Sequence, residues 1–301
     1  MITIPTVFVF GAGVSHPFQF PLGFGLRNRI IDNLDPSNEF YMELRNVGFP
    51  RGEITAFREA LRDSGKESVD AFLEHRTDYI NVGKAAIAQE LTRHEAHSVL
   101  FHSQGENLYF YLYKHLNATP EEFTNNQLTI ITYNYDRSFE HFLFTALRNS
   151  YRLADEQTAE LMRYIPIIHL HGHLGLLPWQ GEGGRNYGSG DRLEDVSIAS
   201  KNIKIIHEQI DVDEDPEFQR AHHYLSNTSR LIFLGFGYDR TNLLRLRLPK
   251  ESTQLQVFGS CYGMTESETT NLKFKFFRGH ATLGRSEYDA LNFLRHSVSL
   301  S

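Results

Sequence analysis

The chain has 301 residues, enough for one large domain or two modest ones. Its net charge of -7 argues against binding nucleic acid through bulk positive charge, so no direct nucleic-acid binding is expected. The single cysteine, Cys261, rules out an intrachain disulfide and a four-cysteine zinc site, and it fits a reducing cytoplasmic setting. Neither a membrane span nor a signal peptide is expected, because no apolar run approaches roughly 18 residues and no basic segment precedes the first apolar run.

The first predicted strand, residues 6–10, is apolar on both faces, which is typical of a central strand in a parallel sheet. The turn that follows is Gly11, Ala12, Gly13, Val14 and Ser15. Its glycines allow the backbone to come close to a ligand, and its N–H groups could donate to a dinucleotide diphosphate ahead of a helix. The usual third glycine is replaced by His16, so a plain tight turn is the alternative.

Helical spacing dominates the first part of the chain after this turn. The apolar residues of 22–34 recur at helical spacing, and several similar stripes follow between 36 and 124 with little that indicates a strand. We therefore predict a helical insertion at 36–124, and a Rossmann-like core made of 1–35 and 125–301. The aromatic stretch 109–113 within the insertion is expected to lie in the core or at an interface.

Strand patterns return after the insertion and alternate with helices. Strands are predicted at 128–132, 165–170, 231–234 and 255–258, with shorter candidates at 203–206 and 272–277. Helices are predicted at 138–149, 217–227 and 287–296, and a loop at 180–195. This alternation predicts an α/β fold with a doubly wound, Rossmann-like parallel sheet.

A polar or glycine-containing cluster follows each main strand. In open α/β sheets ligands bind at the carboxyl edge, so these clusters should converge on one crevice. They contain Gly11–Ser15, Asn134, Asp136, His171, Gly235–Gly237 and Gly259.

Each cluster also has another interpretation. Asn134 and Asp136 could be turn or N-cap residues of the helix that follows them, and the glycines at 235–237 could simply make a tight turn. The alternating His169, His171 and His173 would share one face of a strand, where they could hold a metal ion.

Four of the clusters, taken in order, resemble motifs of the sirtuin superfamily. They are Gly11-Ala12-Gly13-Val14-Ser15, Thr132-Tyr133-Asn134-Tyr135-Asp136, His171-Gly172, and Gly235-Phe236-Gly237 with Asp239. In that order they look like the diphosphate-binding turn, the Thr-x-Asn-x-Asp motif, the catalytic His-Gly pair and the Gly-Thr-Ser type loop. The resemblance covers both ends of the chain and leaves out residues 36–125.

The resemblance implies a site for NAD+. Asn134 and His171 would be catalytic, with His169 mattering much less, and Asp136 would help to hold the nicotinamide carboxamide. The remaining cofactor-binding residues would be Gly11, Ala12, Gly13, Ser15, Gly235, Gly237 and Gly259. His171 is expected to act as a general base, because the ordinary pKa of histidine lies near neutrality.

The chain departs from sirtuin deacetylases in having no zinc ribbon. One cysteine cannot make the four-cysteine site, so no metal is expected. The helical insertion is similar instead to the sirtuin-like proteins of bacterial anti-phage defence, which consume NAD+. We therefore expect an NAD+ glycohydrolase that depletes NAD+ in abortive infection. The alternatives are an NAD-dependent protein deacylase and a non-catalytic module that senses NAD+ or ADP-ribose.

Partners are expected because an NAD+ hydrolase that was always active would kill its host. The chain shows no room for its own sensor, so we expect a homo-oligomer whose activity is switched on by assembly with a separate protein. The resemblance implies a DNA-translocating ATPase or a short Argonaute in that role.

Overall fold

The computed structural model describes residues 1–300 apart from 103–104, 117, 190–192, 206–211 and 250–254. Its strands are β1 (Thr6–Phe10), β2 (Leu128–Thr132), β3 (Ile167–His169), β4 (Arg230–Leu234), β5 (Gln256–Gly259) and β6 (Ala281–Leu283). They form one parallel sheet in the order β3-β2-β1-β4-β5-β6. The predicted α/β fold with a Rossmann-like parallel sheet is confirmed.

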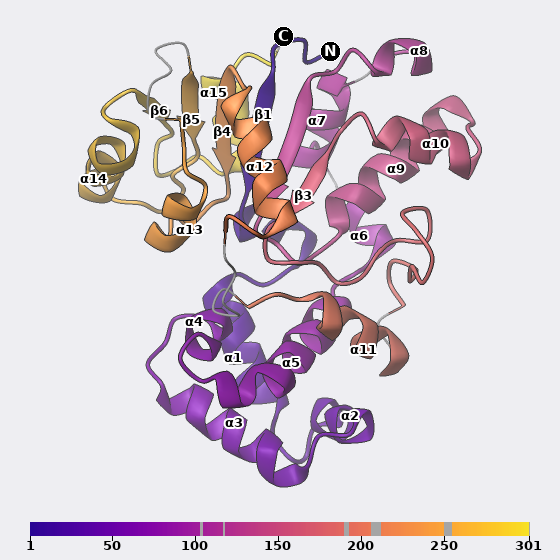
Figure 1. Ribbon diagram of the computed structural model, residues 1–301, viewed down its shortest axis with the longest axis vertical. Coiled ribbons are helices and arrows are strands. Elements are labelled where there is room, and N and C mark those ends of the chain that lie inside the picture. The colour runs from indigo at the N-terminus through magenta and orange to yellow at the C-terminus, as the bar shows by residue number, and fades with distance from the viewer. Residues whose placement is uncertain (103–104, 117, 190–192, 206–211, 250–254, 301) are drawn as a thin grey trace.

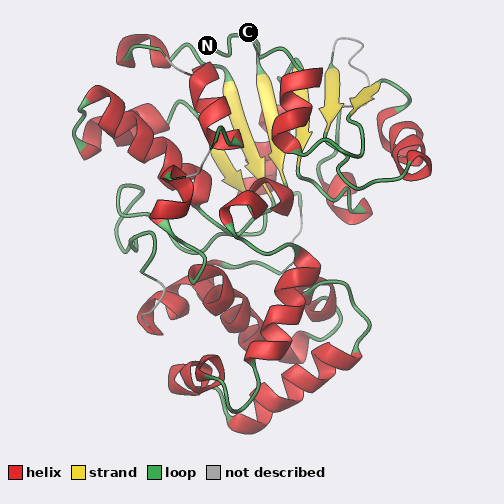
Figure 2. Cartoon of the chain, turned by 180° about the vertical axis from the view of Figure 1, so that it is seen from behind, coloured by secondary structure: helices red, strands yellow, loops and turns green. Residues whose placement is uncertain are grey.

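The central strand β1 is buried on both faces. It pairs with β2 and β4, so that Phe8 lies between Ile130 and Ile232. Phe8 belongs to one apolar core, whereas its neighbours Val7 and Val9 belong to the core on the other face. Alternation of side chains along a strand therefore gives each face of the sheet its own core, and helices cover both faces (Figure 2).

Helices fill the chain between β1 and β2. They are α1 (Gly23–Asn33), α2 (Glu39–Val47), α3 (Arg51–Asp63), α4 (Val69–Leu73), α5 (Ile80–Thr92), α6 (His97–Phe101), α7 (Leu108–Leu116) and α8 (Pro120–Phe123), with short 3-10 turns η1 (Ala12–Val14), η2 (His16–Phe18) and η3 (Thr77–Tyr79). The later helices are α9 (Ser138–Tyr151), α10 (Asp155–Met162), α11 (Leu193–Asn202), α12 (Pro216–Ser226), α13 (Arg240–Arg245), α14 (Glu266–Phe277) and α15 (Ala290–Ser297).

The helices between β1 and β2 lie in two places. Helices α1 to α5 form a group beyond the carboxyl ends of the strands, and α11, from much later in the chain, packs against α5 in the same group (Figure 1). Helix α7 instead packs beside the sheet, against α9 and α15. The division into a core and an insertion at 36–124 stays a prediction.

Three sequence expectations need correction. The segment 272–277 is the end of helix α14, and the sixth strand is β6. Of the expected strand 203–206, Ile203 makes a single antiparallel bridge with Gly172, and the last residue of that range lies outside the described residues. The expected loop 180–195 ends inside helix α11. Among the described residues, no helix combines the length and apolar character needed to cross a membrane.

Candidate functional site

The turns that follow β1 and β4 meet at the point where the chain changes direction across the sheet. From β1 the chain continues to β2 and β3 on one side, and it returns to β4 on the other side. The N–H of Gly11 donates to the carbonyl of Leu234 at 3.0 Å, and the N–H of Gly13 donates to the carbonyl of Gly235 at 2.9 Å. Such a switch point is where open α/β sheets bind ligands.

The glycines at this point are required by backbone packing. A Cβ on Gly11 would lie 2.6 Å from the carbonyl oxygen of Gly235, and a Cβ on Gly13 would lie 2.7 Å from its Cα. Gly235 itself has a φ of 55°, which favours glycine. The N–H groups of Gly11 and Gly13 are bonded within the protein in this conformation, whereas Ala12 is exposed. The role of these residues in holding a diphosphate stays a prediction.

A pocket of about 1010 Å³ opens over the two turns. Of the residues expected to bind a cofactor, Ala12, Gly13, Gly235 and Gly237 line it. Its volume is at the upper end of the range of ligand pockets, roughly 300–1,000 Å³. A dinucleotide is a ligand of that size class.

The outer wall of this pocket comes from the last part of the chain, which motif analysis did not assign to the site. Tyr262, Leu272 and Phe276 supply apolar surface, and Lys275 and Glu287 supply charge. Tyr262 is 71% exposed, so its ring can be covered by a ligand or partner. An aromatic residue a few positions beyond the predicted strand 255–258 is the sequence signal that could have identified it.

Gly259 lies beneath this pocket and does not line it. A Cβ at Gly259 would collide with the hydroxyl of Tyr238, which donates to the carbonyl of Ser260 at 3.0 Å. Ser260 lines the pocket in its place, and its hydroxyl accepts from the N–H of Gly235 at 2.9 Å. Gly259 therefore makes room for Tyr238, and the residue next to it reaches the site.

The structure brings together three residues that the sequence predicted at one site. The Nδ2 amide of Asn134 donates to the hydroxyl of Ser15 and to the carbonyl of Gly11, both at 3.1 Å. The hydroxyl of Ser15 donates in turn to Oδ2 of Asp136 at 2.7 Å. These bonds use the NH₂ of Asn134, so its Oδ1 is the atom that could accept a hydrogen bond from water or a sugar hydroxyl.

Asp136 is buried and is held by the start of helix α9. Its Oδ1 accepts from the N–H of Ser138 at 3.1 Å and also from the Ser138 hydroxyl. Burial raises the pKa of the Asp136 carboxyl, whereas the bonds from Ser138 and Ser15 oppose this rise. Asp136 therefore also has the structural role considered as an alternative above, because its carboxylate holds the first residue of helix α9. Contact with a carboxamide stays a prediction.

A buried histidine and glutamate support Asn134 from the other side. The Nδ1 of His169 donates to the backbone carbonyl of Asn134 at 2.8 Å, and its Nε2 contacts Oε1 of Glu140 at 2.5 Å. Burial acts against a charged imidazole, yet the Glu140 carboxylate outweighs it and raises the pKa of His169. Sequence reasoning missed this pair. A charged residue on the apolar stripe of the helix that begins at Ser138 was the available signal.

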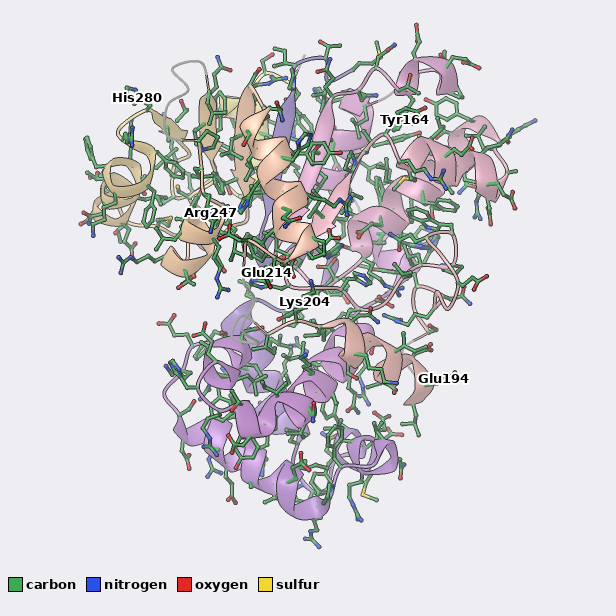
Figure 3. The ribbon with its side chains drawn as sticks, in the orientation of Figure 1. Tyr164, Glu194, Lys204, Glu214, Arg247 and His280 are labelled. Atoms are coloured by element: carbon green, nitrogen blue, oxygen red, sulfur yellow. The ribbon has the colours of Figure 1, made fainter. Side chains whose placement is uncertain are left out.

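His171 lies apart from this network. Its ring packs edge-on against Tyr133, with centroids 4.9 Å apart, and its buried Nε2 has no hydrogen-bond partner among the residues that the structure describes. Burial, with smaller effects from Arg245 and Lys204, lowers the pKa of His171 to about 3. Lys204 lies between the sheet and the helices beyond it (Figure 3). Its backbone N–H donates to the backbone carbonyl of His171 at 2.8 Å. The expectation of a near-neutral pKa is therefore wrong for this conformation.

The three alternating histidines do not converge as metal ligands. His169 faces Glu140, the ring of His173 lies 5.6 Å from that of His169, and His171 packs on Tyr133. Strand β3 ends at His169, so the strand alternation that would align all three side chains does not continue. Within the part of the chain that the structure describes, no group of three or more His, Cys, Asp or Glu side chains could hold a metal ion.

Comparison of the chain with protein-family models and with curated proteins finds no match.

Proposed function

We propose that this protein is an NAD+ glycohydrolase that releases nicotinamide and ADP-ribose. The observation that carries the proposal is the link between the pocket and Asn134. Gly13 lines the pocket, and two residues later Ser15 holds the amide of Asn134 at 3.1 Å. Asn134 itself lines a separate cavity of about 10 Å³ with Ser15 and Asp136, so a dinucleotide whose diphosphate lies at Ala12 and Gly13 would bring its ribose to that amide once this cavity opens. The sirtuin-like order of the motifs supports the same function.

The reaction needs a positioned water more than a strong nucleophile. The bond between nicotinamide and the ribose C1′ breaks, nicotinamide leaves as a neutral molecule, and water adds to C1′ and releases one proton. Asn134 would orient that water or a ribose hydroxyl through its Oδ1, because its NH₂ is fixed by Ser15 and Gly11. Positioning of this kind can supply a large part of a rate enhancement.

The place of His171 favours a second candidate, a module that binds NAD+ or ADP-ribose without turnover. The buried imidazole, with a pKa of about 3, is a poor general base. Under the leading proposal, His171 acts only after a rearrangement that hydrates it. Assembly with further copies or with a separate protein, of the DNA-translocating ATPase or short Argonaute type, is the event we propose for that step. This would fit a cytoplasmic protein that depletes NAD+ during phage infection.

The deciding experiment is incubation of the purified chain with NAD+, followed by chromatography. Nicotinamide and ADP-ribose in equal amounts support the hydrolase, and Asn134→Ala serves as the matched inactive control. Product formed only with an acetyl-lysine peptide would indicate a deacylase. Tight binding of NAD+ with no product, with and without assembly partners, would favour the sensing module and contradict the leading proposal.

A further inference from the structure

The loop that carries Asn134, residues 134–138, is held by the helices that precede β2. Three side chains from α4, the segment after α5, and α7 reach it. They contact three different positions of the loop, so they restrain it along its whole length. We refer to residues 134–138 as the site loop.

The first contact joins Tyr135 to Asp70. Tyr135 is buried, and its hydroxyl donates to Oδ1 of Asp70 in helix α4. Helix α4 lies among the helices beyond the strand ends (Figure 1), and Asp70 precedes Tyr135 by 65 residues. The residue directly after Asn134 is therefore bonded to a different layer of the molecule.

The second contact is a buried ion cluster. Arg137 donates to both carboxylate oxygens of Glu95, at 2.8 and 2.9 Å, and Arg185 donates to the same carboxylate at 2.7 and 2.8 Å. All three side chains are at most 2% exposed. A buried charge that loses its partner is strongly destabilising, so this geometry is tightly enforced.

The third contact runs through hydroxyl groups to the turn after β1. Tyr109 of α7 is hydrogen bonded to Ser138 at 2.7 Å, and Ser138 bonds to Asp136. Asp136 accepts from Ser15, which holds the amide of Asn134. Tyr109 therefore connects to Asn134 through an unbroken chain of hydrogen bonds.

We propose that Asp70, Glu95 and Tyr109 are positioning residues that set the geometry of Asn134 from the helical segment. The inference rests on the proposed function for its effect on turnover, but not for its effect on the site loop. The bonds of Asn134 to Ser15 and to the carbonyl of Gly11 are each 3.1 Å long, and a shift of about 1 Å would exceed hydrogen-bond range. A partner that displaces these helices would therefore change the site without touching the ligand.

The test removes one hydroxyl. Tyr135→Phe keeps the ring and removes the hydroxyl that bonds to Asp70. The matched control, Tyr113→Phe, removes a hydroxyl that bonds to Ser150 at 2.8 Å and to the carbonyl of Ala146, away from the site loop. We expect Tyr135→Phe to lower kcat about tenfold or more with KM changed less than about twofold. Hydrogen exchange of residues 132–138 should also accelerate, whereas the control keeps wild-type values in both measurements.

A second pair of variants separates positioning from general damage. Asp70→Asn keeps an acceptor for the Tyr135 hydroxyl and should behave as wild type, whereas Asp70→Ala should reproduce Tyr135→Phe. Unchanged exchange, or faster exchange with unchanged kcat, would overturn the proposal, as would an Asp70→Asn variant as impaired as Asp70→Ala. If the wild-type chain shows no turnover, the hydrolase proposal fails, and the exchange measurement alone decides whether these residues hold the site loop.

Discussion

Adding one methyl group to Gly13 should separate the two turns at the switch point. The new Cβ would lie 2.7 Å from the Cα of Gly235 and 3.0 Å from its carbonyl oxygen. Both are backbone atoms, so no side chain can rotate away to relieve the contact. Overpacking of this kind costs about 1–3 kcal/mol. For a chain of 301 residues, with an unfolding entropy of about 0.63 kcal/mol/K, that corresponds to a melting temperature about 2–5 °C below wild type.

Gly237→Ala is the matched control for this prediction. A Cβ on Gly237 meets no heavy atom within 4 Å, and Gly237 does not have a positive φ. Its effect on stability should stay within about 1 kcal/mol, because a methyl group in open space adds no clash and restricts the unfolded chain slightly. Gly237 lines the same pocket, so this variant perturbs the ligand side of the site without loosening the turns.

Thermal and urea unfolding followed by circular dichroism compare the two variants with wild type. A Gly13→Ala protein that unfolds at the wild-type midpoint would refute the packing argument, as would equal losses in both variants. Titration with NAD+ then measures the affinity of each variant for the proposed ligand. Weaker binding by Gly237→Ala at unchanged stability would support a ligand-facing role for Gly237.

Three further predictions follow from the site. Asn134→Ala should lower nicotinamide release by orders of magnitude at unchanged circular dichroism, and wild-type turnover would exclude Asn134 from the mechanism. His169→Ala should slow release strongly, contrary to the sequence-based expectation that His169 matters much less than His171, because His169 bonds to the Asn134 carbonyl. The kinetics of the two histidine variants decide between these expectations. The His169–Glu140 pair should stabilise the fold most between pH 4.5 and 6.5, the ordinary pKa values of the two groups. This contribution should fall as pH drops through the lowered pKa of Glu140 or rises through the raised pKa of His169. A difference in stability between wild type and His169→Ala that does not vary with pH would contradict it.

The sheet could be predicted wherever a strand is apolar on both faces. Strands β1, β2 and β4 are such runs, and their positions agree closely with the sequence pattern. The failure at 272–277 has a physical reason. Its apolar residues alternate with lysines as in a strand, but Thr265 and Glu268 form a capping box that starts a helix just before it. A local start signal therefore outweighs a short alternating pattern.

Only the site residues that directly follow a strand could be predicted from the sequence. Asn134 and Asp136 follow β2 directly, so their shared edge with the turn after β1 follows from a parallel sheet. The partners that hold them come from distant parts of the chain, as Glu95 does for Arg137 across 42 residues. Pairings of that kind depend on how the helices pack, and no spacing in the sequence encodes them. The separation of His171 from Asn134 likewise depends on tertiary packing and could not be predicted from the sequence.

The central position of β1 has a consequence for synthesis in the cell. Thr6 leaves the ribosome well before its partner, because the side chain that bonds to it from the neighbouring strand, Arg230, lies 224 residues further along. At translation rates of roughly 5–20 residues per second, that partner follows about 11–45 s later. During this interval an apolar strand has no neighbour on one edge, and such strands aggregate readily. The nascent chain should therefore depend on chaperone binding at β1 until β4 has emerged.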